Sequence, residues 1–258
     1  MDADALCEAA SAATGLDDFG DPAFRAPLEL FLQSGATDGR LNAIGAAALE
    51  QFATEGLEVF GCPCDTMVDA DVANAVAMAS QDDRLDIAVT VPGGGSSKRV
   101  IDWEPDEFSA EVDRNVRPVD LLLHQAVPRM TNGGSFVAVS STAAAFSTRG
   151  LASYRSGKAA VDALVDVAAD ELGEIGVRVN SVRPGLTRTG STTRIFADEQ
   201  LLSRFVSNQA IARGGEAVDV AEAIRFLAGP ESSFVTGQHL AVDGGHTLRS
   251  MPDMRPPA

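Results

Sequence analysis

The chain has 258 residues, of which 45% are hydrophobic and 22% are charged, so it is long enough for one large α/β domain with a single buried core. Its formal net charge of −17 excludes nucleic acids and anionic membranes as expected partners, because both bind basic surfaces. No apolar run approaches the roughly 18 residues of a membrane span, and the chain begins with acidic residues where a signal peptide is basic. We therefore expect a cytoplasmic protein.

The cysteines argue against a disulfide framework and against a metal site. Cys7, Cys62 and Cys64 form an odd and sparse set, as expected for a protein of a reducing compartment. Cys62 and Cys64 are close enough to share a metal, but no further Cys or His cluster completes a set of four ligands. We therefore predict no metal.

The chain divides into three parts of unequal size. Residues 1–27 precede the first predicted strand, residues 28–32, and are treated as an N-terminal extension that caps the core or makes a subunit contact. Residues 28–250 are predicted to form a single domain, and the Pro-rich residues 251–258 a flexible tail.

A glycine-containing stretch follows the first strand and precedes a helix that is predicted to end at residue 55. Its candidate ligand-binding residues are Gly35, Thr37, Gly39 and Gly45. Glycines after a strand let the backbone approach a pyrophosphate group, which rests on the N-terminus of the following helix. The stretch is a candidate phosphate-binding loop, and a plain surface turn is the alternative that the sequence leaves open.

Two further strands are predicted before residue 100. Residues 57–61 form the first, and Asp65 follows it closely. Residues 85–89 form the second, and Gly93 then opens a run of three glycines. Gly93 allows a ligand to approach the backbone closely, although three consecutive glycines also make an ordinary flexible loop.

The residues with the clearest chemistry come next along the chain. A predicted helix carries Asn115, and a strand over residues 135–139 ends just before Ser141. Tyr154 and Lys158 are four residues apart, so they share one face of a helix. A neighbouring ammonium favours the phenolate, which predicts a Tyr154 pKa below its usual value of about 10. Ser141 could hydrogen-bond a substrate oxygen while Tyr154 gives or takes its proton, which is chemistry for an alcohol or a carbonyl.

The remaining pattern predicts the fold class. The last two predicted strands are residues 177–182 and 239–242. Strands that alternate with helices predict an α/β fold with an open, mostly parallel sheet and helices on both faces. Ligands of such sheets bind beyond the carboxyl ends of the strands, so Gly93, Ser141 and Gly185 are expected in one crevice.

The set Asn115, Ser141, Tyr154 and Lys158, followed by a Pro-Gly turn, resembles the short-chain dehydrogenase/reductase family from about residue 28 to residue 249. The resemblance implies a Rossmann-like, doubly wound fold and NAD or NADP as the cofactor. It implies that Tyr154 is the general acid/base and that Lys158 lowers the tyrosine pKa and holds the nicotinamide ribose. Ser141 would orient the substrate oxygen, and Asn115 would support a water path that returns the proton through Lys158.

The N-terminal half departs from the family pattern. Gly45 arrives four residues late, and Pro63 stands where family members carry a side chain that grips the adenosine ribose. Asp65 lies in a segment that the family reaches only after a further helix and strand, so one β–α–β step is expected to be shortened. Asp65 would then meet an adenine amino group. Thr90 replaces an asparagine that steadies the central strand in the family, and could partly substitute for it.

We expect an oxidoreductase that interconverts a secondary alcohol and a ketone, with Gly185 and Thr189 at the nicotinamide end of the cofactor. Residues 192–205 would cover the substrate, and their apolar and threonine side chains favour a largely apolar alcohol or ketone. The resemblance also implies a homodimer or homotetramer that is formed through residues 235–245.

Two alternatives remain open. The stretched glycine loop and Pro63 favour a cofactor-independent lyase, isomerase or dehalogenase that uses Ser141, Tyr154 and Lys158. Lys158 argues against it, since the dehalogenases of this fold prefer arginine at that position. A family member without catalysis, serving as a subunit partner or binding module, is the other alternative. It predicts that Tyr154→Phe changes no activity.

Overall fold

The computed structural model describes residues 29–33, 44–48, 64–80 and 83–249, and for residues 29–33 it describes the backbone. In this part of the chain five parallel strands form one sheet in the order β1–β2–β3–β4–β5. The strands are β1 (Glu29–Gln33), β2 (Ile87–Val91), β3 (Gly134–Val139), β4 (Val177–Pro184) and β5 (His239–Val242). The predicted strand at residues 57–61, the shortened β–α–β step, the N-terminal extension and the C-terminal tail lie outside the described residues.

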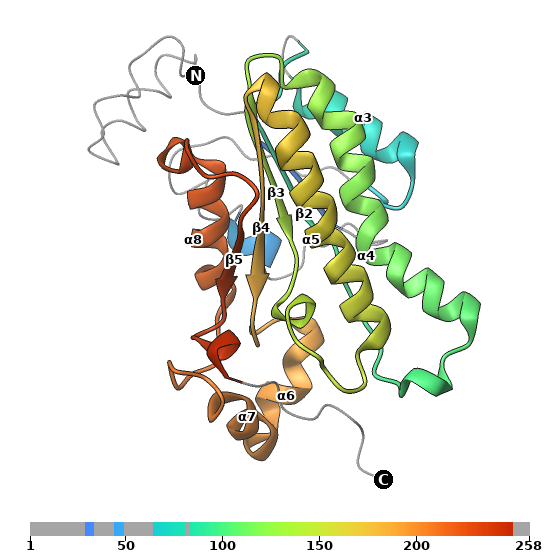
Figure 1. Cartoon of the computed structure of the whole chain (residues 1–258), viewed down its shortest axis with the longest axis vertical. Coiled ribbons are helices and arrows are strands. Elements are labelled where there is room, and N and C mark those ends of the chain that lie inside the picture. Colours follow the sequence, from blue (N-terminus) through green and yellow to red (C-terminus); the bar gives the residue numbers. More distant parts are fainter. Residues whose placement is uncertain (1–28, 34–43, 49–63, 81–82, 250–258) are drawn as a thin grey trace.

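Helices cover both faces of the sheet (Figure 1). Three of them lie on one face and α8 lies on the other. Their bounds are α3 (Asp69–Ala79), α4 (Pro105–Ala126), α5 (Ala152–Leu172) and α8 (Ala217–Ala228). This is the arrangement of a doubly wound α/β protein, so the predicted fold class is confirmed.

Each face of the sheet has its own hydrophobic core. Ala88 and Phe136 pack into the core that α3, α4 and α5 cover, whereas Val89 and Val137 pack into the core that α8 covers. Neighbouring residues of a strand point to opposite faces, so a strand buried on both faces needs apolar residues at successive positions. This is why β2 has the uninterrupted sequence Ile-Ala-Val-Thr-Val.

The last β–α–β connection of the sheet has the opposite handedness to the two connections before it. The β2–α4–β3 and β3–α5–β4 units step in one direction and place their helices on the same face. The β4–α8–β5 unit steps in that direction too but places α8 on the opposite face, so it has the opposite hand. Its connection also carries two short helices beyond the carboxyl ends of the strands, α6 (Thr193–Ala197) and α7 (Glu199–Val206).

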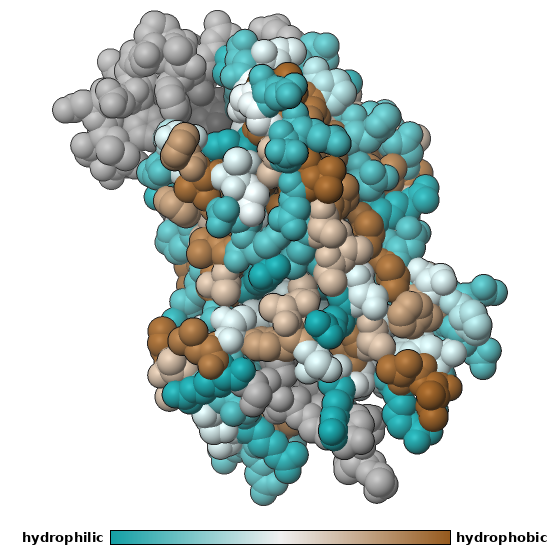
Figure 2. All heavy atoms as spheres, viewed as in Figure 1, coloured by the Kyte–Doolittle hydropathy of each residue, from teal (hydrophilic) through white to brown (hydrophobic). Residues whose placement is uncertain are grey.

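The segment between β2 and α4 runs along the surface next to the start of α5. Figure 2 shows apolar atoms gathered at the lower right, over this segment, where Val100 and Ile101 are 73% and 81% exposed. Lys98 N–H donates to the carbonyl of Gly150 at 2.9 Å, which holds the segment against the loop before α5. None of the helices in the described ranges has both the length and the apolar character needed to cross a membrane.

Candidate active site

The carboxyl ends of β2, β3 and β4 bring three of the predicted site residues to one edge of the sheet. Gly93 follows β2, Ser141 follows β3 and Gly185 follows β4. The ends of β3 and β4 are joined by a hydrogen bond from Thr142 Oγ1 to the carbonyl of Pro184 at 3.2 Å. The predicted convergence is therefore present, and it follows from the parallel order of the strands.

Ser141 and Tyr154 meet in this crevice. Ser141 is buried at the end of β3, where its Oγ accepts a hydrogen bond from Ala143 N–H at 3.1 Å. A side-chain hydrogen bond also joins Ser141 to Tyr154, which lies half-buried in the first turn of α5. The bond to Ala143 fixes the Ser141 rotamer, so its hydroxyl group is held toward the phenol.

Lys158 lies one turn further along α5 and is 1% exposed. Its Nζ donates to the carbonyls of Pro92 at 2.7 Å and Val139 at 2.8 Å, which are at the ends of β2 and β3. Burial lowers the pKa of Lys158 to about 7, while the nearby charge of Asp162 acts in the opposite direction. The ammonium therefore ties two strand ends together and is close to losing its proton at neutral pH.

The pKa of Tyr154 is raised in this structure, so the expectation of a lowered pKa was wrong. Burial of the phenol is the larger cause, and the hydrogen bond from Ser141 opposes it. Lys158 Nζ lies 5.8 Å from the centre of the tyrosine ring and is directed at main-chain carbonyls. Desolvation therefore outweighs the cation.

Asn115 is fully buried on α4 and faces the same crevice. Its Nδ2 donates to the carbonyls of Glu111 at 2.9 Å and Gly94 at 3.2 Å, whereas its buried Oδ1 has no hydrogen-bond partner among the described residues. A Cβ on Gly157 would lie 2.8 Å from the Asn115 Cβ, so only glycine lets α5 approach α4 this closely. This close packing brings Asn115 beside Lys158.

The glycine run after β2 packs against the site. The sequence analysis had allowed the alternative that these three glycines form an ordinary flexible loop. A Cβ on Gly95 would lie 2.7 to 2.8 Å from three carbons of Tyr154, so the loop backbone rests directly on the tyrosine. Gly94 has a φ of +137°, which side chains rarely tolerate. The glycines are therefore needed for close approach and for backbone conformation.

Glu111 is a residue of the site that the sequence analysis missed. It is 4% exposed on α4, and its carboxylate accepts hydrogen bonds from Ser96 N–H and Ser153 Oγ. The signal was present, because Glu111 is four residues before Asn115 and so shares its buried helix face. A buried carboxylate requires hydrogen-bond donors as partners, so this position already indicated further polar groups around Asn115.

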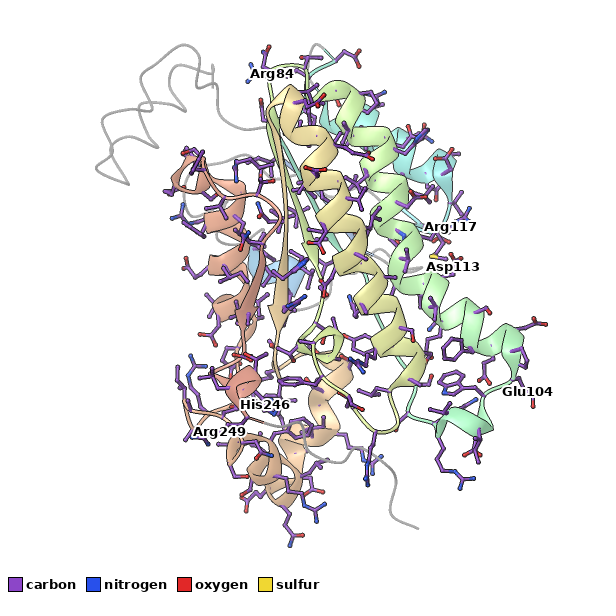
Figure 3. The ribbon with its side chains drawn as sticks, viewed as in Figure 1. Arg84, Glu104, Asp113, Arg117, His246 and Arg249 are labelled. Atoms are coloured by element: carbon purple, nitrogen blue, oxygen red, sulfur yellow. The ribbon has the colours of Figure 1, made fainter. Side chains whose placement is uncertain are left out.

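The segment after β5 meets the predicted substrate cover. His246 is fully buried, and its ring lies 5.9 Å from Phe146 and 6.4 Å from Phe205. Phe146 belongs to the loop after Ser141 and Phe205 to α7, and Figure 3 shows His246 next to α7 at the end of the sheet. The contacts of these three rings therefore hold α7 near the loop that follows Ser141.

The structure describes only some of the other predicted cofactor-binding residues. Gly35, Thr37, Gly39 and Pro63 lie outside the described residues, and Gly45 lies in the helical residues 44–48. Asp65 is exposed before α3, and its Oδ1 accepts from Met67 N–H at 2.9 Å. Thr189 begins the short helical turn after Gly185 and forms a capping box with Thr192.

Thr90 does not take over the strand-steadying role that was considered for it. It is fully buried in β2, but its Oγ1 has no hydrogen-bond partner in the described part of the chain. A threonine hydroxyl is shorter than an asparagine amide and offers one donor where the amide offers two, so it does not reach the neighbouring strands.

A cavity of about 360 Å³ lies at the far side of the crevice and does not include the predicted catalytic residues. Its walls come from residues after β4 and β5 and from the start of α8, among them Leu186, Gln209, Val220 and Asp243. The chemistry of the site is therefore located by the side chains at the strand ends and not by this cavity.

Comparisons with known proteins agree with this geometry. Residues 34–247 match a family model described as enoyl-(acyl carrier protein) reductase. The 7α-hydroxysteroid dehydrogenase of Escherichia coli K12 is 32% identical over 193 residues, which cover 74% of this chain and 75% of that protein. A cyclopentanol dehydrogenase of Comamonas is 33% identical over 170 residues, covering 65% and 68%. A solved short-chain type dehydrogenase/reductase from Mycobacterium ulcerans superimposes with a TM-score of 0.79 at 31% identity, covering 88% of this chain and 92% of that one.

Proposed function

Because this chain belongs to the short-chain dehydrogenase/reductase family, we propose that it is an oxidoreductase that interconverts a secondary alcohol and a ketone with NAD or NADP, using Tyr154 as general acid/base. The observation that carries the proposal is the crevice in which Ser141 hydrogen-bonds Tyr154 beside a buried Lys158. These groups can hold an oxygen atom and move a proton to or from it.

The residues at the strand ends fit the ribose end of a nicotinamide nucleotide. A Cβ on Gly93 would lie 3.4 Å from Lys158 Nζ and 3.7 Å from Asn115 Oδ1, so the backbone of Gly93 faces a cation and an acceptor that has no partner in the part of the chain that the structure describes. An ammonium has three N–H groups, and Lys158 gives two of them to carbonyls. The third can serve a ribose hydroxyl. Gly185 and Thr189 would contact the nicotinamide end.

The protein supplies proton transfer and positioning. When bound, the nicotinamide ring supplies or accepts the hydride. Tyr154 gives its phenolic proton to the carbonyl oxygen of the substrate during reduction and takes it back during oxidation. Ser141 Oγ accepts from Ala143 N–H, and its hydroxyl hydrogen, which is directed at Tyr154 in this structure, would donate to the same substrate oxygen when a substrate binds. The oxygen is thus held by two donors.

Asn115 and Lys158 are proposed to return the proton to Tyr154. The support is the buried Asn115 Oδ1, which no described residue hydrogen-bonds and which lies near Gly93 together with Lys158 Nζ. A water molecule can donate to this oxygen and accept from the ammonium. A lysine pKa of about 7 suits a group that passes protons at neutral pH.

The proposed substrate is a largely apolar alcohol or ketone. Two relatives are named for a hydroxysteroid and for cyclopentanol, both of which carry the hydroxyl on a ring. Aromatic rings lie at the proposed cover of the crevice in this chain, since His246 contacts both Phe205 of α7 and Phe146. Aromatic and apolar walls favour a substrate that offers apolar surface around one oxygen.

The cofactor-independent alternative rests on residues 34–45 and Pro63, most of which the structure does not describe. Nothing in the crevice favours it over nicotinamide chemistry, because Lys158 and Asn115 keep the groups that suit a nucleotide. A subunit partner without catalysis is disfavoured as well, since burying Lys158 is costly in free energy and a protein without catalysis would not need it.

We also propose that the chain forms a homodimer or homotetramer through residues 235–245. Within the described sheet β5 pairs with β4 alone, and Leu240 on β5 is 37% exposed. Phe234, just before this region, is fully exposed. An unpaired strand edge beside exposed apolar side chains favours covering by a second copy.

The experiment that tests the function uses dialysed protein and both nucleotides. We expect NADH or NADPH to change the fluorescence of Trp103, the single tryptophan, and cyclopentanone or a ketosteroid to be reduced with loss of the nucleotide absorbance. Failure of both nucleotides to bind at millimolar concentration would overturn the proposal. Turnover of a substrate by nucleotide-free protein would instead support the cofactor-independent alternative.

A further inference from the structure

We propose that Glu111 is a positioning residue for this reaction, which fastens the glycine loop after β2 against Tyr154. The inference rests on the proposed function of Tyr154 as the general acid/base. Glu111 itself is not placed to touch a substrate, and its role is to hold the two pieces of chain that enclose the tyrosine.

The carboxylate of Glu111 is buried and is held by hydrogen-bond donors alone in the described part of the chain. Ser96 N–H is 3.0 Å from both carboxylate oxygens, and Ser153 Oγ is 2.5 Å from Oε1. Ser153 is in the first turn of α5, where the N-terminal end of the helix carries partial positive charge. These donors and the helix end stabilise a buried negative charge that would otherwise be costly.

The loop that Glu111 holds is in contact with the catalytic residues along its length. Lys158 Nζ bonds the carbonyl of Pro92, and Asn115 Nδ2 bonds the carbonyl of Gly94. Gly95 lies against the Tyr154 ring, with no room for a Cβ. Ser96 is the next residue of the loop, and its N–H donates to the Glu111 carboxylate. Glu111 therefore anchors the end of this stretch.

Glu111 therefore binds two segments of the chain that contact the tyrosine, the glycine loop and the start of α5. Ser96 is adjacent to Gly95, which touches the ring, and Ser153 immediately precedes Tyr154 on α5. A carboxylate suits this task because it accepts several hydrogen bonds and donates none, whereas a glutamine offers one acceptor oxygen. If the carboxylate is removed, the loop is expected to move away from the ring and let water reach the phenol.

The test compares Glu111→Ala and Glu111→Gln with Asp113→Asn, an exposed acid on the same helix that points away from α5 in Figure 3. Tyr154 is the single tyrosine of the chain, so an absorbance titration of the phenolate reports on this residue alone and needs neither substrate nor nucleotide. The turnover number and nucleotide binding, followed by Trp103 fluorescence, complete the measurements.

For Glu111→Ala we expect a turnover number about 10- to 100-fold lower, as for a small misplacement of a catalytic group, with nucleotide binding largely kept. The phenol is expected to titrate at lower pH than in the wild type, because its burial is relieved. Glu111→Gln keeps an acceptor for Ser96 and should lose about two- to tenfold, as for one hydrogen bond. Asp113→Asn should match the wild type in every measurement.

A folded Glu111→Ala protein with wild-type turnover and an unchanged Tyr154 titration would overturn the inference. If Glu111→Ala does not fold, Glu111→Gln decides: wild-type values for both readings overturn the inference, and partial losses in both support it. Absence of any activity in the wild type would remove the proposed function. The Tyr154 titration would still show whether Glu111 holds the loop.

Discussion

Lys158 Nζ lies 5.8 Å from the centre of the Tyr154 ring, and two of its N–H groups are used by the carbonyls of Pro92 and Val139. The lysine therefore joins the ends of β2 and β3 through these two hydrogen bonds. Both ionisable groups are shifted toward their neutral forms, the pKa of Lys158 downward and the pKa of Tyr154 upward, with burial as the main cause.

The burial of Lys158 predicts that stability depends on pH. The lysine pKa is about 7 in the folded protein, whereas the ordinary pKa of lysine is 10.5, so between these values the unfolded chain binds one more proton. The free energy of unfolding should then rise with pH in this window, by about 1.4 kcal/mol per pH unit from this group. Urea unfolding at pH 7, 8 and 9 should show this rise in the wild type and its loss in Lys158→Met.

Lys98→Met is the matched control for that experiment, because the chain has just these two lysines and Lys98 is on the surface. It should keep the rise of stability with pH. The claim that burial lowers the pKa of Lys158 would be contradicted if the stability of the wild type does not rise between pH 7 and 9 relative to that of Lys158→Met.

Ser141→Ala should raise the pKa of Tyr154 further. The hydrogen bond from Ser141 lowers this pKa, so its removal leaves the effect of burial unopposed. The absorbance of the phenolate measures the change directly, since no other tyrosine is present. The variant should also lose about 1 kcal/mol of stability, because Ala143 N–H loses its partner. An unchanged or lowered titration point would show that the two hydroxyl groups are not in contact.

Gly95→Ala should reduce activity through the position of Tyr154. The added methyl group would lie 2.7 Å from the Tyr154 Cβ, on a rigid helix, so the loop or the ring has to move. We expect a turnover number roughly 10- to 100-fold lower and a stability loss of about 1–3 kcal/mol. Gly173→Ala is the control, because no atom lies within 4 Å of its added Cβ. It should leave activity unchanged, and wild-type turnover in Gly95→Ala would contradict the contact.

Much of the fold and of the catalytic set could be predicted because their signals are local. The strands have short apolar runs, and Tyr154 and Lys158 are one helical turn apart, so their relation needs no tertiary information. The crevice at the strand ends then follows from a parallel sheet. Asn115, Ser141, Tyr154 and Lys158 lie near one another for these reasons, and their catalytic roles stay predictions.

The Tyr154 pKa shift and the role of Glu111 depend on tertiary packing, which the spacing of residues along the sequence does not show. The direction of the Tyr154 pKa shift reverses because the phenol is enclosed by Gly95, which comes from a distant loop. Glu111 was missed because its partners, Ser96 and Ser153, are 15 and 42 residues away in the sequence. Their proximity is created by the close approach of α4 and α5 at Gly157.

The turnover of a secondary alcohol by the wild type and by Tyr154→Phe, with NAD or NADP present, tests the central proposal most directly. Phenylalanine keeps the ring and its packing and removes the hydroxyl group that is proposed to transfer the proton, so the turnover number should fall about 10²- to 10⁴-fold while nucleotide binding is kept. A Tyr154→Phe protein that reduces the nucleotide at the wild-type rate would contradict the assignment of Tyr154 as the acid/base.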